Sequence, residues 1–286
     1  MKPKIYDCFI FFNELDLLEL RLNHLNPYVD YFVLVESVIT FTGKKKKLFY
    51  EENKELFKDF EDKIIHVVVD DAPGEAIGKD PWVIERHQRN SMAKGLVNCR
   101  DEDIIITSDL DEIVSFKPLL DLESHYHPEK LSHFAQNMFY YYLNLQETSG
   151  KLIAHSGEFD GVTHRKWLGS KMCSYGFLKN YSVDALRQPE MKAGGIRIPN
   201  GGWHFTYAGS HRKTSARERI IMKLQSFSHQ EFNNNYYISR IDNNLESLGD
   251  VFLRDSKFEI VPIDEGFPSY IADNREKFAH LIKDQE

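Results

Sequence analysis

The first 115 residues alternate between short apolar runs and amphipathic segments, and this alternation constrains the fold more than any other feature. Four runs rich in β-branched and aromatic residues are typical of buried strands. They cover residues 5–12, 31–35, 64–69 and 104–107. Between the first two runs, a leucine recurs every three or four residues, which predicts a helix, with Asn13 as its cap. The pattern therefore predicts an α/β fold with a Rossmann-like, mostly parallel central sheet flanked by helices.

Composition narrows the class of protein. The chain has 286 residues, 42% of them hydrophobic, which is enough for one large domain with a real core. The formal net charge of -8 argues against a nucleic-acid partner, because phosphate backbones need a basic surface. The three cysteines lack metal-type spacing and suit a reducing compartment. No stretch approaches the roughly 20 apolar residues of a membrane span, so we expect a soluble chain.

The fourth apolar run leads into two aspartates one residue apart, Asp109 and Asp111. In open α/β sheets, ligands bind outside the carboxyl ends of the strands. Carboxylates placed there suit Mn²⁺ or Mg²⁺, which would neutralise the diphosphate that leaves a nucleotide-sugar donor. The alternative is that one aspartate only caps the following turn. His204, which follows Gly201 and Gly202, is a candidate third metal ligand, or else an ordinary hydrogen-bonded histidine.

Other side chains are candidates for binding the donor. Arg86, Arg89 and Asn90 share one face of a predicted helix over residues 82–97, where guanidinium groups would meet a diphosphate. The alternative is a solvated face paired with Glu85. Trp203 is a candidate stacking surface for a sugar ring, with core packing as the alternative.

An inverting sugar transfer needs a carboxylate as general base near the acceptor hydroxyl. Glu158 and Asp160 lie in a polar, glycine-flanked segment of the second half and are the preferred candidates. Asp264 and Glu265 are rivals, and the sequence does not choose among the four.

Several segments, taken in order, resemble glycosyltransferase family 17. They are residues 7–15, 18–22, 35–37, 40–43, 85–90, 108–113 and 202–204. The match is dense over residues 5–115 and thin beyond them, apart from the Trp-His segment. Animal members of the family carry an N-terminal membrane anchor, which we do not expect here, so the resemblance points to a cytoplasmic enzyme of bacterial or viral type.

The resemblance implies a GT-A-type fold, a UDP-sugar donor with UDP-GlcNAc first, a divalent metal and inversion at the anomeric carbon. It also implies that Asp109 and Asp111 form the metal motif, and that Asn13, Glu14 and Glu36 lie near the nucleotide. We expect a single GT-A-like domain over residues 1–286. Its nucleotide-sugar-binding half would be 1–115, and 116–286 would be an aromatic-rich acceptor-side half; no oligomeric state is predicted.

Two functions of other classes compete with a transferase that acts on a glycan acceptor. A haloacid-dehalogenase-type Mg-dependent phosphatase also has a strand followed by Asp-x-Asp, although there the motif follows the first strand of the fold. A non-catalytic carbohydrate-binding protein would use the aromatic residues alone for recognition.

Overall fold

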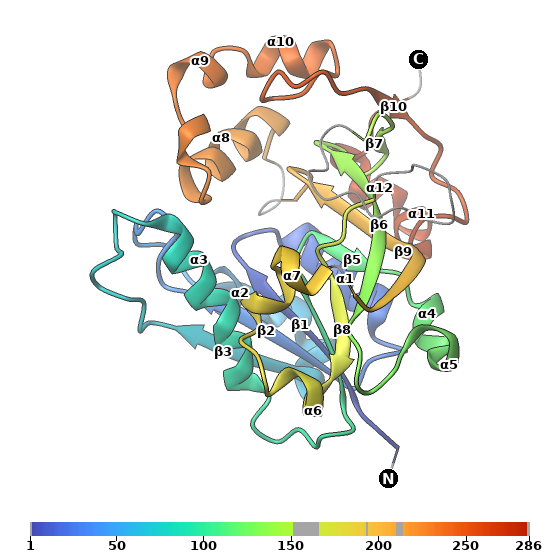
Figure 1. Cartoon of the computed structure of the whole chain (residues 1–286). Coiled ribbons are helices and arrows are strands. Elements are labelled where there is room, and N and C mark those ends of the chain that lie inside the picture. Colours follow the sequence, from blue (N-terminus) through green and yellow to red (C-terminus); the bar gives the residue numbers. More distant parts are fainter. Residues whose placement is uncertain (1, 151–165, 193, 210–213, 285–286) are drawn as a thin grey trace.

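The computed structural model describes residues 2–150, 166–192, 194–209 and 214–284, and its centre is a ten-stranded sheet (Figure 1). The strands are β1 (Ile5–Phe11), β2 (Tyr31–Ser37), β3 (Ile64–Val69), β4 (Ile104–Asp109), β5 (Glu112–Val114), β6 (Ser132–Tyr140), β7 (Leu145–Glu147), β8 (Lys171–Ser174), β9 (Ile196–Thr206) and β10 (Phe258–Ile260). Strands from both halves of the chain belong to this one sheet.

The helices lie around the sheet. They are α1 (Leu15–Leu25), α2 (Phe49–Asn53), α3 (Pro81–Asn90), α4 (Lys117–Leu120), α5 (Leu122–His125), α6 (Tyr175–Leu178), α7 (Pro189–Lys192), α8 (Ala216–Ser226), α9 (Asn235–Ile238), α10 (Ile241–Glu246), α11 (Ser269–Asp273) and α12 (Arg275–Phe278). Short 3-10 helices cover Lys54–Lys63, Ser91–Gly95, Asp184–Arg187, Gln230–Phe232 and Ala279–Leu281.

The first four strands are parallel and stand in the order β3-β2-β1-β4. The chain runs outward from β1 to β3 on one side and then returns to place β4 on the other side of β1. The point between β1 and β4, where this order reverses, is where open α/β sheets bind ligands. In the register of these strands, Ile10 of β1 lies opposite Asp109 of β4. The α/β class with a central sheet flanked by helices is confirmed.

The second half extends the sheet with a different pattern. Strand β8 pairs antiparallel with β4, and β6, β7 and β10 continue outward in antiparallel pairs. The long strand β9 runs parallel to β6. It also pairs with β5, the short strand that directly follows the Asp-x-Asp motif. Helix α8 lies next to the end of β4, since its Lys223 forms an ion pair with Asp111 at 2.8 Å.

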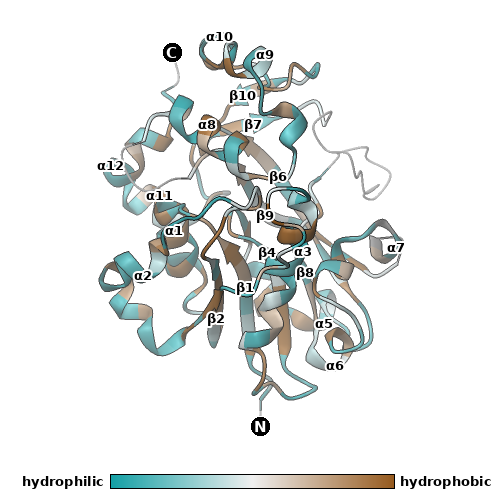
Figure 2. Ribbon diagram, turned by 90° about the vertical axis from the view of Figure 1, so that its left-hand side faces the viewer, coloured by the Kyte–Doolittle hydropathy of each residue, from teal (hydrophilic) through white to brown (hydrophobic). Residues whose placement is uncertain are grey.

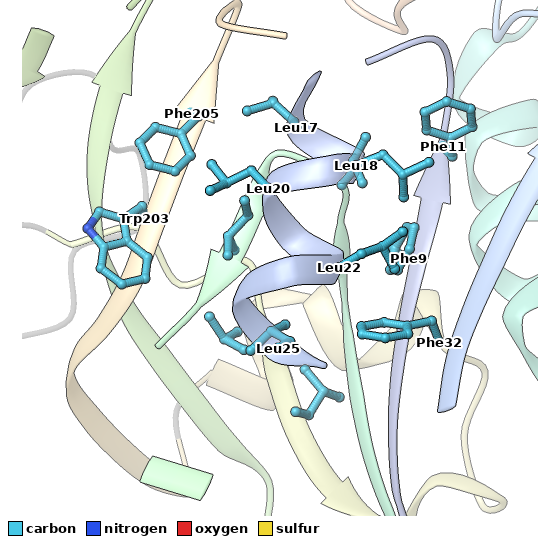
Figure 3. Close-up of a cluster of buried hydrophobic side chains, with 14 of the residues drawn as sticks. Phe9, Phe11, Leu17, Leu18, Leu20, Leu22, Leu25, Phe32, Trp203 and Phe205 are labelled. Atoms are coloured by element: carbon cyan, nitrogen blue, oxygen red, sulfur yellow. The ribbon is translucent and has the colours of Figure 1, made fainter. Parts of the chain in front are cut away.

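Helix α1 is the centre of the hydrophobic core. Figure 3 shows Leu18 and Leu22 directed toward Phe9 of β1, while Leu20 lies on the side of Trp203 and Phe205 of β9. A helix that buries apolar residues on nearly every face must be covered on several sides. Figure 2 shows the same distribution, with hydrophobic residues concentrated along the central strands. Helix α1 therefore ties the parallel strands to the second half of the chain.

The cap of α1 differs from the predicted one. Asn13 does not cap α1: Glu14 occupies that position without a side-chain cap bond. The amide of Asn13 instead donates to the sulfur of Met222 in α8, at 2.6 Å. Ser215 caps α8 through a reciprocal capping box with Glu218.

The two glycines before His204 belong to a strand. Gly201 and Gly202 lie inside β9. Gly202 has φ +129°, and a Cβ there would stand 2.2 Å from the carbonyl oxygen of Ile113, so this glycine allows close strand packing. The segment beyond Arg254 contains β10, α11 and α12. In the ranges that the structure describes, no helix is both long and apolar enough to cross a bilayer.

Candidate functional site

A cavity of about 120 Å³ opens at the switch point between β1 and β4. We call it the switch-point cavity. Its lining residues come from the ends of β1 and β4, from the segment after β2, from α3 and from α8 with the residue after it: Ile10, Phe11, Phe12, Glu14, Ile39, Thr40, Phe41, Lys46, Gln88, Asp109, Leu110, Asp111, Lys223, Ser226 and Phe227. The sequence-predicted Asp-x-Asp motif therefore lies in a cavity at the carboxyl ends of parallel strands.

The backbone of the Asp-x-Asp turn is held from behind by Arg21 of α1. The guanidinium of Arg21 is fully buried and forms a two-point ion pair with Asp7, at 2.6 and 2.7 Å. Its Nη1 donates to the carbonyl oxygens of Asp109, Leu110 and Glu112 at 3.0, 3.2 and 3.1 Å. One planar cation thus satisfies three carbonyls of a tight turn and fixes its shape.

The carboxylate of Asp109 faces two arginines. Arg89 of α3 lies 3.1 Å from it, and Arg187 lies 3.3 Å from it. Burial raises the pKa of Asp109, while the two guanidinium groups act in the opposite direction. Arg89 also pairs with Glu85 and Asp184, each at 2.7 Å. Arg89 therefore pairs with Glu85, as the alternative interpretation expected, and it also reaches Asp109 of the motif.

Glu112, the next acidic residue, is fully buried and pairs with the same Arg187. Its two carboxylate oxygens accept from Arg187 at 2.8 and 2.9 Å, and the indole nitrogen of Trp167 donates to one of them at 2.5 Å. Burial alone would raise the pKa of Glu112, but the Arg187 guanidinium holds it down at about 2. At Gly169 a Cβ would stand 2.0 Å from the Glu112 carboxylate, so glycine is required for this close approach.

Asp111 faces the other side of the turn. Its carboxylate lies 2.8 Å from the ammonium of Lys223 on α8 and 3.6 Å from Nε2 of His204 on β9. Despite burial, these neighbours hold the pKa of Asp111 far below its ordinary value. The His204 ring packs against Trp167, with centroids 4.7 Å apart. Two of the predicted metal ligands, Asp111 and His204, are thus neighbours, and Lys223 is the third member of their group.

The residues expected near the nucleotide differ in whether they line a cavity. Glu14 lines the switch-point cavity, and burial raises the pKa of its carboxyl. Asn13 lines a small neighbouring cavity together with Lys223 and Met222. Glu36 is fully buried, where it accepts from the backbone nitrogen of Tyr50 and pairs with Lys46 at 3.4 Å. Glu36 therefore does not line the cavity itself, and its ion pair holds Lys46, which does.

A second cavity, of about 470 Å³, adjoins the first and shares Asp109, Lys223, Phe41 and Phe227 with it. We call it the outer cavity. Its other lining residues are Trp82, Glu85, Arg86, Arg89, Trp167, Leu168, Gly169, Asp184, Arg187, Gln188, Ser228 and His229. The indole of Trp82 is 41% exposed and meets the His229 ring edge-to-face at 4.6 Å. Aromatic faces and charged groups thus line one continuous depression.

Other predicted residues lie elsewhere. Trp203 is 8% exposed and packs in the core against His24, so the structure gives it the core role that was the alternative (Figure 3). Asn90 accepts from the backbone nitrogen of Asp184 and thereby positions the partner of Arg89. Asp264 and Glu265 are exposed and line neither cavity. Glu158 and Asp160 lie outside the described residues.

The three side chains expected to hold a metal do not form a ready set of ligands. Asp109 is engaged by Arg89 and Arg187, and Asp111 is engaged by Lys223. Over the described ranges, no group of three or more His, Cys, Asp or Glu side chains is placed to hold a metal ion. As arranged, these residues do not fit a divalent cation, because side-chain cations already stand beside both carboxylates.

Sequence reasoning missed Lys223 and Arg187. Lys223 lies on the inner face of α8, next to the buried Arg219, Ile220 and Leu224. A lysine on the apolar face of a helix is an available signal, because an unpaired charge is costly to bury. Arg187 ends a short 3-10 helix, and no sequence pattern singles it out.

The fold and the site define an α/β protein with a charged ligand cavity at its topological switch point. The sequence model of Glycosyltransferase family 17 matches residues 1–252. The chain belongs to glycosyltransferase family 17, and it is a glycosyltransferase. The match confirms the resemblance seen in the sequence.

Individual relatives match over shorter lengths. The beta-1,4-mannosyl-glycoprotein 4-beta-N-acetylglucosaminyltransferases of Homo sapiens and Rattus norvegicus are each 31% identical over 107 residues. Those residues are 35% of this chain and only 20% of each relative. Among solved structures, the apo-form glycosyltransferase GlyE of Streptococcus pneumoniae TIGR4 aligns with a TM-score of 0.30 and 9% identity. That alignment covers 94% of this chain and 53% of the other, and a score of this size does not establish a shared fold.

Proposed function

We propose that the protein is an inverting glycosyltransferase that moves a sugar from a UDP-sugar donor to a hydroxyl group of a glycan acceptor. The observation that carries this proposal is the position of Asp109, Asp111 and Lys223 in one cavity at the switch point of a parallel sheet. This is where α/β folds bind the phosphates of nucleotides. Membership of glycosyltransferase family 17 supports the reaction class.

The switch-point cavity suits the nucleotide. Phe12, Ile39 and Phe41 give it apolar walls, which suit a base and a ribose. Lys46 and Lys223 also line it, and they would supply the positive charge that a diphosphate needs. N-acetylglucosamine is the first sugar to test, because the relatives that match part of this chain are named N-acetylglucosaminyltransferases.

The outer cavity suits the acceptor. It is the larger of the two, and Trp82 and Trp167 offer aromatic faces on which sugar rings can stack. Its border with the switch-point cavity contains Asp109 and Lys223. A donor sugar at this border would have its diphosphate on one side and an acceptor hydroxyl on the other.

In the proposed reaction, an acceptor oxygen forms a bond to the anomeric carbon as the bond to the β-phosphate oxygen breaks. The electron pair of the broken bond goes to the diphosphate, and the hydroxyl proton goes to a carboxylate base. Glu158 and Asp160 stay the proposed bases. The divalent metal expected from the sequence is not part of this proposal, because the residues as arranged do not fit it, and no step above depends on it.

Incubation with UDP-GlcNAc and other UDP-sugars, with release of UDP as the readout, tests this proposal. We expect UDP release from one donor, and faster release when a glycan acceptor is added. Turnover of p-nitrophenyl phosphate without a need for UDP-sugar would instead identify a phosphatase. Binding of glycans without binding of UDP would identify a carbohydrate-binding protein.

A further inference from the structure

Lys223 stands at the meeting point of three neighbouring cavities. Its side chain lines the switch-point cavity, the outer cavity and the small cavity beside Asn13. The ammonium nitrogen lies 2.8 Å from Asp111 and 3.4 Å from the hydroxyl of Thr206. It also lies 5.0 Å from the centre of the Tyr207 ring. These contacts fix the ammonium at the border of the switch-point cavity and the outer cavity, where a ligand in either can reach it.

The ammonium has hydrogen-bonding capacity to spare. A lysine carries three N–H donors. Asp111 and Thr206 are the acceptors found for Lys223 in the described part of the chain, which leaves one donor for a ligand. Its side chain keeps 30% of its surface exposed, so a phosphate oxygen has access to it.

The other carboxylate of the motif has a matching arrangement. Arg89 and Arg187 lie within 3.1 and 3.3 Å of Asp109, and both line the outer cavity. Each aspartate of the motif is therefore neutralised by a cation that belongs to the chain. A divalent ion between the aspartates would have to displace Lys223 or stand beside it, and like charges at this distance repel strongly.

We propose that Lys223 takes the place of a divalent metal and binds the departing diphosphate directly, while Asp111 positions the ammonium. This proposal rests on the proposed transfer from a UDP-sugar. As the bond between the anomeric carbon and the β-phosphate oxygen breaks, its electron pair remains on that oxygen. The free N–H of Lys223 donates to the diphosphate and stabilises the added negative charge. The ammonium stays protonated, so no proton has to leave it.

Titration calorimetry of UDP and of uridine, in EDTA and then with MnCl₂, tests the proposal. We expect the wild-type protein to bind UDP in EDTA, with less than about a threefold change on adding Mn²⁺. Lys223→Met should weaken UDP binding in EDTA by about tenfold or more, the usual size of a lost charge-assisted bond, and leave uridine binding unchanged. Lys223→Arg keeps the charge and should retain most of the affinity. Lys94→Met, which removes a lysine paired with Asp71 outside both cavities, is the matched control.

Two results would overturn the proposal. One is wild-type protein that binds UDP only when Mn²⁺ is present, a comparison that needs no variant. The other is folded Lys223→Met protein that binds UDP in EDTA as tightly as the wild type. Failure of the wild type to bind UDP or uridine under either condition would contradict the UDP-sugar function itself. This result differs from the two results that overturn only the role of Lys223.

Discussion

Arg21 donates a hydrogen bond to the carbonyl oxygen of Asp109 at 3.0 Å, from a guanidinium that has no exposed surface. The bond joins the middle of the core helix α1 to the first aspartate of the site. The same guanidinium binds Asp7 of β1, so β1, α1 and the end of β4 meet at one side chain. The direction of the Asp109 and Asp111 side chains therefore depends on a buried ion pair behind the cavity.

Replacing this arginine should destabilise the whole protein. Arg21→Met leaves Asp7 buried and unpaired and removes the donor to three carbonyls, so we expect a loss of about 3–5 kcal/mol in the free energy of unfolding. Urea unfolding measures this loss. Arg217→Met removes an arginine paired with Asp242 on the surface and should cost less than about 1 kcal/mol. Equal losses in the two variants would contradict the role given to Arg21.

The Arg187–Glu112 pair should give a pH-dependent stability. The folded-state pKa of Glu112, about 2, lies below the value of about 4.3 expected for an unfolded chain. Its contribution is therefore fully present above about pH 4.3 and is lost as the pH falls toward 2. In Arg187→Met the buried carboxyl loses its counter-charge, and its pKa rises. The variant should be less stable than the wild type by about 3–5 kcal/mol at pH 7, and the difference should shrink toward pH 3.

Urea unfolding of both proteins at several pH values between 3 and 7 measures this difference. Arg217→Met again provides the control, since its partner Asp242 is largely exposed. A deficit of Arg187→Met that stays constant over this range would show that Glu112 does not supply the effect.

Two tryptophans should separate packing from substrate binding. Trp203→Ala removes a core side chain and should lower the free energy of unfolding by about 3–5 kcal/mol. Trp82→Ala should change it by less than Trp203→Ala does, because 41% of Trp82 is exposed to solvent. In transfer assays Trp82→Ala should raise the acceptor KM by up to about tenfold and leave the donor KM unchanged, since only the stacking face is lost. A raised donor KM would contradict the assignment of Trp82 to the acceptor-binding cavity.

The general base should be revealed by neutral variants of the proposed carboxylates. If Asp160 or Glu158 takes the acceptor proton, Asp160→Asn or Glu158→Gln should lower kcat by about 10²–10⁴ without weakening UDP binding. Asp264→Asn changes an exposed acid away from both cavities and should leave kcat unchanged. Steady-state kinetics and UDP titration provide the two readouts. Unchanged kcat in both variants would move the base to another residue.

Much of the fold could be predicted because its signals are local. Apolar runs and leucine spacing identified the first four strands and α1. The length of the segment between two strands limits which strands can be neighbours in the sheet. The position of Asp109 and Asp111 at the end of β4 followed from the same pattern. The cap of α1 was predicted wrongly, because Asn13 has a competing contact with Met222, 209 positions away in the chain. Trp203 gave no local sign of its burial, since an aromatic residue suits a core and a sugar platform equally.

The sequence by itself determined the α/β alternation and the two aspartates at a strand end, since both depend on residues close together in the chain. Only the tertiary structure decided what those aspartates face. Lys223 lies 112 positions from Asp111, and Arg187 lies 75 positions from Glu112, so no periodicity relates them. Buried charges need partners, and the fold supplies them from whichever distant segments pack against the same strand ends.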